Sequence, residues 1–458
     1  MSNASITIIG GGLAGCEAAW QAANHGAHVT LYDMKPDTYS PAHESPDLGE
    51  LVCSNSFRSN DQASAVGLLK EEMRLFDSLL MQVAEKTKVP AGKALAVDRQ
   101  KFAAAITKAL SDHPDIDIVR QEVKELPSSG ITILASGPLT ASDLAADLAR
   151  LTGAEHLAFY DAIAPIVSAD SLNRHIIYQA SRYDDGPGDY LNCPFNEEEY
   201  KRFIQALGAA DKVPLKSFEK KKYFEGCLPI EVMLERGDDT LRFGPMKPVG
   251  LPDPRTGKDP YAVVQLRMED REGSHYNMVG FQTKLTYPAQ KEVFRLIPGM
   301  EDVDFIRLGS IHRNTFVCAP KVLQPSLQLQ DHPHILLAGQ ISGVEGYVES
   351  TAMGILAGRN AVRLAQNLAP LMPPADTAHG ALIRHLTEPL SKHFQPSNVN
   401  YSLFPPFDKK AFRASQPELP ALPNKRRRRS RISKRDKAAF RSAQAIASMK
   451  AWLLEAAL

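Results

Sequence analysis

Hydrophobic and polar residues follow a pattern that predicts a mixed α/β fold for the first third of the chain. Short apolar or β-branched runs at residues 5–9, 27–32, 116–120 and 130–135 are typical of buried strands. Residues 65–86 carry apolar side chains three or four positions apart, which predicts one long amphipathic helix. Another helix is expected after Asp98, whose carboxylate is a suitable N-cap. Strands that alternate with helices indicate a doubly wound domain with a parallel sheet.

The pattern changes between residues 156 and 308, where tyrosines, prolines and charged loops become frequent. Asn196 and Glu199 have the spacing of a helix capping box, and Pro229 is expected in the first turn of a helix with the sequence PIEVMLERG. A strand, a glycine turn and a small-residue helix return over residues 335–362. We therefore expect one domain from residues 1–155 and 309–458, with an α+β domain inserted at 156–308. A proline-rich linker at 405–423 leads to a final helix at 437–457.

A glycine-rich turn follows the first predicted strand. Its candidate cofactor-binding residues are Gly10, Gly11, Gly12, Leu13, Ala14 and Gly15, and Asp33 ends the next strand about twenty residues later. The pattern Gly-x-Gly-x-x-Gly allows a tight turn, a close approach of a pyrophosphate to the backbone, and close packing of helix on strand. The helix N-terminus then faces the phosphate, and the acid accepts a hydrogen bond from a ribose. The sequence therefore predicts an ADP-containing cofactor.

The segment at residues 335–362 distinguishes between NAD and FAD, the two common ADP-containing cofactors. Gly339 and Gly346 lie between the strand and the helix of residues 335–362, where Gly354 and Gly358 suit close helix packing and Glu349 complements the helix dipole. A bare NAD domain does not need such a segment. Its presence favours FAD and a two-segment Rossmann-like FAD-binding domain of the GR2 flavoprotein type.

Composition narrows the location and excludes some chemistries. In 458 residues, 43% hydrophobic and 23% charged, no apolar run approaches the length of a membrane span. The first strand begins almost at once, which leaves no room for a signal peptide. The five cysteines form no CxxC pair, so neither a zinc site nor a disulfide framework is expected. These features predict a cytoplasmic protein without a metal.

A basic run lies near the end of the chain, although the formal net charge is zero. Residues 425–441 hold ten Lys or Arg and a single acid. Such a run is either a solvated tail or a phosphate-binding patch for nucleic acid, and composition does not choose between them. The candidate RNA contacts are Lys425, Arg426, Arg427, Arg428 and Arg429.

Several blocks resemble one family along essentially the whole chain. They include GGGLAGCEAAW, PAHESPDLGELVCSNSFRSN, VPAGKALAVDR, FEGCLPIEVMLERG, LRFGPMKPVGL and NMVGFQTKL. These blocks are similar to the folate- and FAD-dependent tRNA (uracil-5-)-methyltransferases. The resemblance implies a flavoprotein that uses FAD, methylenetetrahydrofolate and NADH or NADPH to methylate C5 of the T-loop uridine, position 54, of tRNA. It also implies that the inserted domain binds the RNA substrate.

This chemistry requires an activated thiol. C5 of uracil becomes nucleophilic only after a group adds to C6, and a thiolate is suited to add and leave again. Cys53 and Cys227 lie in blocks specific to the family, so the resemblance implies that one is the nucleophile and the other the base. The predicted helix start at Pro229 gives Cys227 a reason to ionise, whereas the sequence offers Cys53 only Arg58. The helix thus favours Cys227 as nucleophile, but sequence does not settle the roles. The other three cysteines, at positions 16, 193 and 318, are expected to be small buried hydrophobes.

Weaker substrate-binding candidates are His312, Arg313, Asn314, Arg242 and Lys247. The first three could contact the pteridine or the nucleotide, or could be structural; the other two could bind phosphate or the folate glutamate tail. Three alternative functions remain: the same chemistry on ribosomal RNA, aminomethylation of wobble uridine, and a flavin oxidoreductase with a small-molecule substrate. The aminomethylating relatives have a long C-terminal helical domain, and fewer than a hundred residues follow residue 362 here.

Overall fold

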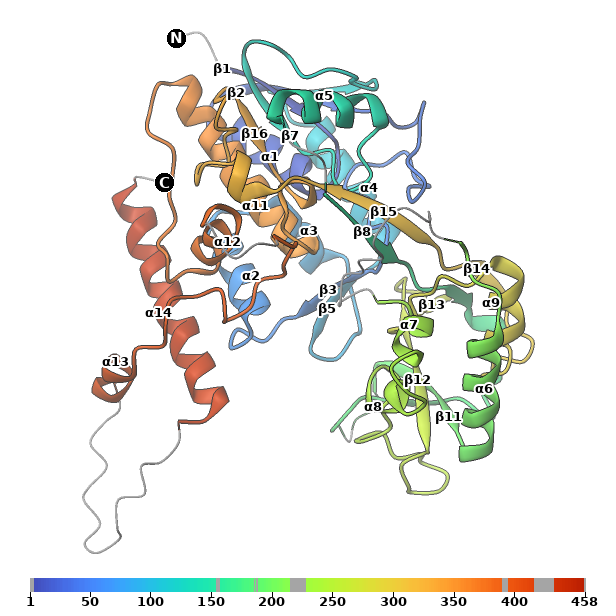
Figure 1. Ribbon diagram of the computed structural model, residues 1–458. Helices are drawn as coiled ribbons and strands as arrows, with labels where there is room; N and C mark the ends of the chain where they lie inside the picture. Colours follow the sequence, from blue (N-terminus) through green and yellow to red (C-terminus); the bar gives the residue numbers. More distant parts are fainter. Residues whose placement is uncertain are drawn as a thin grey trace, which may run out of the picture.

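The computed structural model describes residues 4–153, 157–184, 186, 188–214, 228–388, 394–415 and 432–456, with the side chains of 157–160 and of Arg313 left out. Figure 1 shows two lobes that are joined by a pair of long strands. No helix in these ranges is long and apolar enough to cross a membrane.

A parallel sheet of five strands forms the centre of the first lobe, in the order β16-β7-β1-β2-β6. The strands are β1 (Ala4–Ile9), β2 (Ala27–Asp33), β6 (Ile116–Arg120), β7 (Ile131–Leu134) and β16 (Ile335–Leu337). Ile6, Ile8, Val29 and Leu31 are fully buried in this sheet, as the apolar runs predicted. The late strand β16 pairs in parallel with β7, so the two segments of the chain form one sheet. The predicted doubly wound α/β fold is confirmed.

Helices cover this sheet: α1 (Leu13–Asn24), α4 (Arg99–Ser111), α5 (Ser142–Thr152) and α11 (Tyr347–Ala365). Asp98 caps α4, because its carboxylate accepts from Lys101 N. Helix α11 lies directly against α1: a Cβ on Gly354 would approach Ala14 O to 2.3 Å, and one on Gly358 would approach Ala18 O to 2.5 Å. The small residues of the late segment therefore allow the close helix packing that the sequence predicted.

The prediction of a single helix over residues 65–86 is wrong. The structure has two helices, α2 (Ala65–Leu75) and α3 (Leu79–Lys86). Asp77 adopts a φ of 54°, and the Ser78 side chain caps α3 by accepting from Met81 N. The buried carboxylate of Glu17 accepts from Ser78 Oγ at 2.8 Å and from the N–H groups that open α3. A charged group from α1 thus stabilises a helix start inside a continuous apolar pattern.

The second lobe has its own hydrophobic core, formed by residues between Val167 and Val303. Its antiparallel sheet has the order β10-β11-β12-β13-β9-β14. The strands are β9 (Ile166–Ser168), β10 (Tyr178–Ala180), β11 (Tyr190–Phe195), β12 (Ala262–Met268), β13 (His275–Met278) and β14 (Phe305–Arg307). Helices α6 (Glu197–Ala209) and α9 (Tyr287–Phe294) pack on it, next to the short α7 (Ile230–Leu234), α8 (Thr240–Phe243) and the 3₁₀ turn η1 (Ala169–Ser171). The predicted capping box at Asn196 and Glu199 is confirmed.

Two small β units lie between the cores. The antiparallel pair β8 (Leu157–Ala162) and β15 (Ile311–Phe316) carries the chain into the second lobe and back. A three-stranded sheet, β3-β5-β4, comprises β3 (Ser56–Ser59), β4 (Lys88–Val89) and β5 (Ala94–Val97). It lies at the boundary of the lobes, where Tyr190 Oη donates to Ala91 O.

The C-terminal region packs on the first lobe through α10 (Ala319–Val322), η3 (Gln340–Ser342), α12 (Ala378–Thr387) and α14 (Lys434–Glu455). Helix α14 begins at Lys434, three residues before the predicted start, because Ser433 caps it through Asp436 N. The predicted linker at 405–423 is not free of structure, since α13 (Lys409–Ala414) lies within it. Asp408 caps α13 by accepting from Lys410 N and Ala411 N, a start signal that the prolines obscured.

Candidate active site

The glycine turn between β1 and α1 opens onto a cavity of about 1120 Å³, part of it open to solvent. Gly10 has a φ of 110°, and a Cβ there would lie 2.5 Å from Ala135 O. A Cβ on Gly15 would lie 1.8 Å from Gly10 O, so contact between helix and strand requires that glycine. At Gly12 a Cβ would meet no protein atom within 4 Å. Packing within the protein therefore explains Gly10 and Gly15, whereas the space at Gly12 is left for a ligand.

The cavity lies at the carboxyl ends of the parallel strands, the usual ligand position in such sheets. Gly12, Leu13 and Ala14 line it at the start of α1, and no side chain caps that helix. Uncapped N–H groups at a helix N-terminus are suited to bind a pyrophosphate. The wall opposite is formed by residues 135–141, and Gly339, Gln340, Tyr347 and Ser350 close one end. The residues present fit an extended dinucleotide such as FAD.

Asp33 lines the same cavity, but its carboxylate also organises the turn. Its Oδ2 accepts from Gly11 N at 2.9 Å and its Oδ1 accepts from Lys35 N at 2.9 Å. A Cβ on Gly11 would meet Asp33 Oδ2 at 2.5 Å, so this position also needs glycine. Each carboxylate oxygen keeps a further lone pair, which leaves Asp33 able to accept from a ribose hydroxyl.

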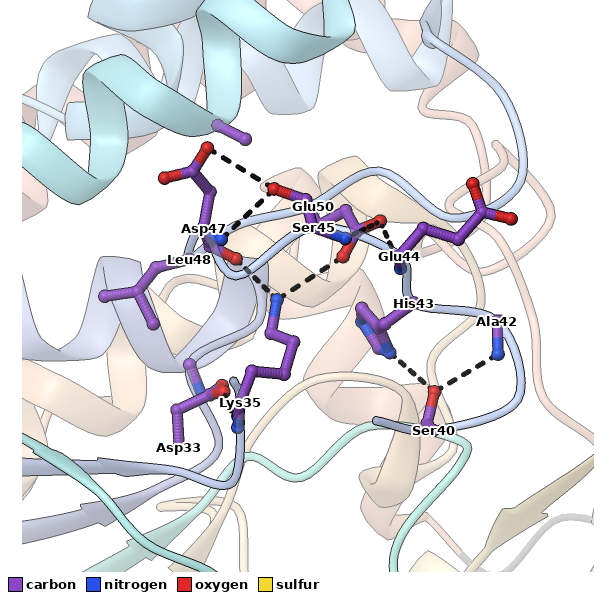
Figure 2. Close-up of polar contacts among 12 residues, drawn as sticks. Asp33, Lys35, Ser40, Ala42, His43, Glu44, Ser45, Asp47, Leu48 and Glu50 are labelled. Atoms are coloured by element: carbon purple, nitrogen blue, oxygen red, sulfur yellow. Dashed lines mark hydrogen bonds and ion pairs between the residues drawn. The ribbon is translucent and has the colours of Figure 1, made fainter. Parts of the chain in front are cut away.

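A loop at residues 40–50 forms another wall of the cavity (Figure 2). None of its residues was predicted from the sequence to be in the site. The buried Lys35 ammonium donates to Asp47 O and pairs with Glu50 at 3.4 Å. Glu50 Oε1 in turn accepts from Glu44 N at 2.9 Å and Ser45 N at 3.2 Å. His43 Nδ1 lies 2.6 Å from Ser40 Oγ, and burial, with the positive charge of Lys35, lowers the pKa of His43 to about 4. His43 is therefore neutral at pH 7. The position of these residues at the cavity wall could be identified only from the contacts that the folded chain makes.

Cys53 is half-buried on the segment that leads from this loop into β3. Its backbone N–H donates to Tyr347 Oη at 2.7 Å, and Ser54 N donates to the same hydroxyl at 3.1 Å. Tyr347 also lines the cofactor cavity. One side chain therefore holds the Cys53 segment against the wall of the cavity.

The cationic neighbours of Cys53 differ from the sequence expectation. Arg58 points away, because its guanidinium pairs with Glu349 near the start of α11. Instead, Arg99 and Arg267, from α4 and β12, interact electrostatically with the Cys53 sulfur. Arg267 donates to Ser54 Oγ at 2.7 Å and to Asn55 Oδ1 at 2.9 Å, and Arg99 donates to Leu51 O. Both guanidinium groups also interact with Glu269, which pairs with Arg99 at 3.0 Å. The fold thus gives Cys53 two cations that sequence spacing could not reveal.

Cys227 lies outside the described residues. Pro229 is the N-cap of α7, which is only five residues long. A helix of this length has a weaker dipole than the longer helix that the sequence suggested. Cys16 and Cys193 are fully buried, and burial raises the pKa of both thiols.

The weaker candidates are spread over the molecule. His312 lies on β15, with Nε2 2.8 Å from Ser310 Oγ; burial lowers its pKa, and it acts electrostatically on His43. Asn314 is buried and its side chain is 3.5 Å from Asp161 Oδ2, while the side chain of Arg313 is not described. Arg242 stacks on Tyr261 at 4.2 Å, and Lys247 is exposed nearby. Neither basic residue lines the cofactor cavity, and Gly346, the N-cap of α11, lies just outside it.

Two further predictions concern the RNA-binding residues and metal binding. The RNA candidates Lys425, Arg426, Arg427, Arg428 and Arg429 lie outside the described residues. Among the residues that are described, no three or more His, Cys, Asp or Glu form a group that could hold a metal ion.

Comparison with known proteins relates this site to a family. Residues 5–369 match the family model described as "Glucose inhibited division protein A". The solved structure of Aquifex aeolicus GidA has the same fold, with a TM-score of 0.64 and 16% identity over 86% of this chain and 68% of that one.

Curated relatives share far more of the sequence. A protein of Desulfotalea psychrophila is 67% identical over 407 residues, 88% of this chain and 92% of its own length. One of Geobacter sulfurreducens is 58% identical, over 89% of this chain and 94% of its own. One of Citrifermentans bemidjiense is 55% identical, over 98% of this chain and 99% of its own. All three carry the name methylenetetrahydrofolate--tRNA-(uracil-5-)-methyltransferase TrmFO. The chain therefore belongs to the TrmFO family of folate- and FAD-dependent tRNA (uracil-5-)-methyltransferases, within the glucose inhibited division protein A group.

Proposed function

We propose that this protein methylates C5 of the T-loop uridine, position 54, of tRNA, with methylenetetrahydrofolate as carbon donor and FAD as its flavin cofactor. Family membership supports the reaction class. One observation carries the assignment to this site: the Tyr347 hydroxyl binds the N–H groups of Cys53 and Ser54 while Tyr347 lines the cofactor cavity. A reactive thiol is thereby held beside the place where a flavin fits.

The turn at residues 10–15 would hold the cofactor pyrophosphate, and Asp33 would accept from its ribose. Support comes from the open space at Gly12 and from the uncapped start of α1. When bound and reduced by NADH or NADPH, FAD would supply the electrons for transfer of the one-carbon unit from the folate to the uracil. The residues around it orient it and exclude water: loop 40–50 covers one side, and Tyr347 begins α11 at the end of the cavity.

The thiols perform the chemistry on the base. Addition of a thiolate to C6 moves an electron pair to C5, which makes C5 able to form the new carbon–carbon bond. A base then removes the C5 proton, the C6–S bond breaks to release the thiolate, and a hydride from the reduced cofactor would complete the methyl group. Arg99 and Arg267 interact electrostatically with the Cys53 sulfur, and Arg99 also pairs with Glu269 at 3.0 Å. We assign the roles of nucleophile and base to Cys53 and Cys227, one to each.

The partner that we propose is tRNA, received between the two lobes by the segment 156–308 as an inserted domain. Its support is the separate hydrophobic core of this segment and the contacts of its Arg267 with the Cys53 loop. The alternative of a ribosomal RNA substrate receives no support, because the relatives are named as tRNA methyltransferases. The relatives are named as methyltransferases, which also argues against the aminomethylating alternative.

The test is a methylation assay on the FAD-loaded full chain. It is incubated with NADPH, unmodified tRNA and methylenetetrahydrofolate labelled at the methylene carbon, and nucleosides are analysed by mass spectrometry. We expect labelled 5-methyluridine in tRNA, none in a matched ribosomal RNA fragment, and none when S-adenosylmethionine replaces the folate. Label in the ribosomal fragment alone would move the assignment to that RNA. NADPH oxidation without any labelled uridine would reject RNA methylation.

A further inference from the structure

The described ends of the basic C-terminal region form one fixed surface, which we call the basic lobe: residues 408–415 and 432–441. It comprises α13 and the first two turns of α14, which lie side by side at the lower left of Figure 1. Its sequence holds seven Lys or Arg and two Asp, a net charge of +5 in a chain whose net charge is zero. The rest of the chain is therefore acidic overall, and positive charge is concentrated here.

The lobe is held together by an aromatic cluster. Phe407, Phe412 and Phe440 pack on one another with ring centroids 5.2–5.9 Å apart. Lys437 and Arg441 lie over the Phe407 ring at 5.7 and 5.6 Å, and Arg441 also donates to Tyr401 O and Pro405 O. These contacts fix α13 on α14. The cations are therefore presented on a rigid support.

The remaining five cations point to solvent. They are Lys409, Lys410, Arg413, Lys434 and Arg435, all exposed, and none forms an ion pair within the part of the chain that is described. The two acids are at helix starts: the Asp408 carboxylate caps α13, and the Asp436 backbone N–H in the first turn of α14 donates to Ser433 Oγ. Some exposed lysines elsewhere on the first lobe are paired, such as Lys101 with Glu272 at 2.6 Å, Lys108 with Asp112 at 2.7 Å and Lys124 with Asp143 at 3.7 Å. At the basic lobe, five described cations gather without such partners.

The lobe is attached to the turn that follows β3. Tyr401 Oη lies 3.0 Å from Ala63 O and 3.3 Å from Ala438 O, which ties α14 to the turn after β3. That turn is ten residues beyond Cys53 along the chain. A polynucleotide with one base at Cys53 has neighbouring phosphates outside the cavity, and a cationic surface on the same body is suited to bind them.

We propose that the basic lobe is a docking surface for the phosphate backbone of the RNA substrate, outside the catalytic cavity. This inference rests on the proposed function for the identity of the RNA. The chemistry favours RNA over a membrane, because the apolar side chains of the lobe are used in its aromatic cluster and leave no free face to enter lipid. It favours RNA over a protein partner, because lysines are depleted from the centres of protein interfaces.

The test compares two triple variants of the FAD-loaded full chain. Lys409→Gln/Lys410→Gln/Arg413→Gln removes three unpaired cations of the lobe, and Lys101→Gln/Lys108→Gln/Lys124→Gln removes three exposed cations that already have acidic partners. We measure tRNA binding from low to moderate salt. The lobe variant should bind about tenfold more weakly at physiological salt, with a salt slope reduced by about two to three. The control variant should match wild type in slope, and both should keep their flavin and thermal stability.

Other outcomes are distinguishable. Equal slopes for the lobe variant and wild type would overturn the inference, even if wild type methylates tRNA normally. Loss of binding to vesicles with about one-third anionic lipid, with RNA binding unchanged, would also overturn it in favour of a membrane. A reduced RNA slope in a protein that forms no 5-methyluridine would uphold the docking surface and reject the proposed reaction.

Discussion

The glycine turn lines the cofactor cavity and the Cys53 segment lies beside it, but the two are built in opposite ways. The turn is local: Gly10, Gly15 and Asp33 lie within 24 residues, and their backbone contacts fix its shape. The Cys53 segment is held by Tyr347, Arg267 and Arg99, which lie 294, 213 and 48 residues away from their partners. Local glycine turns of this kind bind cofactors in many proteins. The position of the Cys53 thiol, in contrast, depends on contacts from both lobes. The comparison implies that the two regions can be disrupted separately.

The largest expected effect comes from the turn. Gly12→Val should abolish FAD binding, because its side chain fills the only space that the protein leaves open there. The apoprotein should unfold within about 1 kcal/mol of wild type, since Gly12 has an extended backbone that any residue can adopt. Flavin absorbance and urea unfolding measure the two effects.

Gly15→Val is the matched control for this variant. Its Cβ would lie 1.8 Å from Gly10 O, so we expect the apoprotein itself to lose at least about 1–3 kcal/mol. If both variants kept a full complement of FAD, the turn would not be the cofactor site.

Next in size is the loss of Arg267, which belongs to the second region. Arg267→Met removes two hydrogen bonds to the Cys53 segment and one of the two cations near the sulfur. We expect methyl transfer to fall about 100-fold, which corresponds to about 2.7 kcal/mol, with FAD content unchanged. Arg267→Lys, which keeps the charge, should lose less. A variant that lost FAD instead would show that the two regions are not separable.

His43 tests the wall of the cofactor cavity by its pH dependence. Its pKa is about 4 in the folded protein and about 6.5 when unfolded, so the unfolded chain binds more protons between these values. The contribution is fully present above pH 6.5 and is lost as the pH falls towards 4. Between pH 7.5 and 4.5, wild type should lose about 2–3 kcal/mol more stability than His43→Gln. His175→Gln, at an exposed histidine, should behave like wild type; equal losses in all three would contradict the low pKa.

The smallest effect is expected from the residue that the two regions share. Tyr347→Phe removes the hydroxyl that accepts from Cys53 N and Ser54 N, at a cost of about 1–2 kcal/mol of folding stability. Displacement of the segment should slow methyl transfer about tenfold while FAD stays bound. Tyr178→Phe removes a comparable buried hydrogen bond to Leu251 O in the second lobe, and should lose stability without loss of transfer. Equal transfer rates in the two variants would mean that the hydroxyl does not position Cys53.

The same contrast explains what the sequence could predict. The strands of the parallel sheet, the glycine turn, the Asn196 capping box and the close packing of α11 on α1 depend on local sequence patterns, and each was predicted correctly. The break between α2 and α3 was missed because the apolar pattern continues through it and Glu17 stabilises it from another helix. Helix α13 was missed because prolines around it indicated a linker, although Asp408 is an ordinary cap.

The site residues differ in the same way: some could be predicted from the local sequence, and others depend on contacts made by the fold. Arg58 was expected beside Cys53 because it is close in sequence, but its charge is neutralised by Glu349 on α11. Arg99 and Arg267 could not be chosen among 53 Lys and Arg residues without the fold. Loop 40–50 lies mostly within a block that resembles the family, but none of its residues was predicted to be in the site, because its contacts with Lys35 depend on how the loop closes over the end of β2. The roles of Cys53 and Cys227 stay a prediction.

The most direct measurement compares wild type with Cys53→Ala, both loaded with FAD, in transfer of labelled carbon to tRNA. We expect the two proteins to have the same flavin spectrum and the same rate of flavin reduction by NADPH, because Cys53 does not line the cofactor cavity. Wild type should form labelled 5-methyluridine, and Cys53→Ala should form it at least about 10²–10⁴-fold more slowly. Equal rates of methyl transfer in the two proteins, at equal flavin content, would contradict the claim that the thiol segment and the cofactor cavity form one active site.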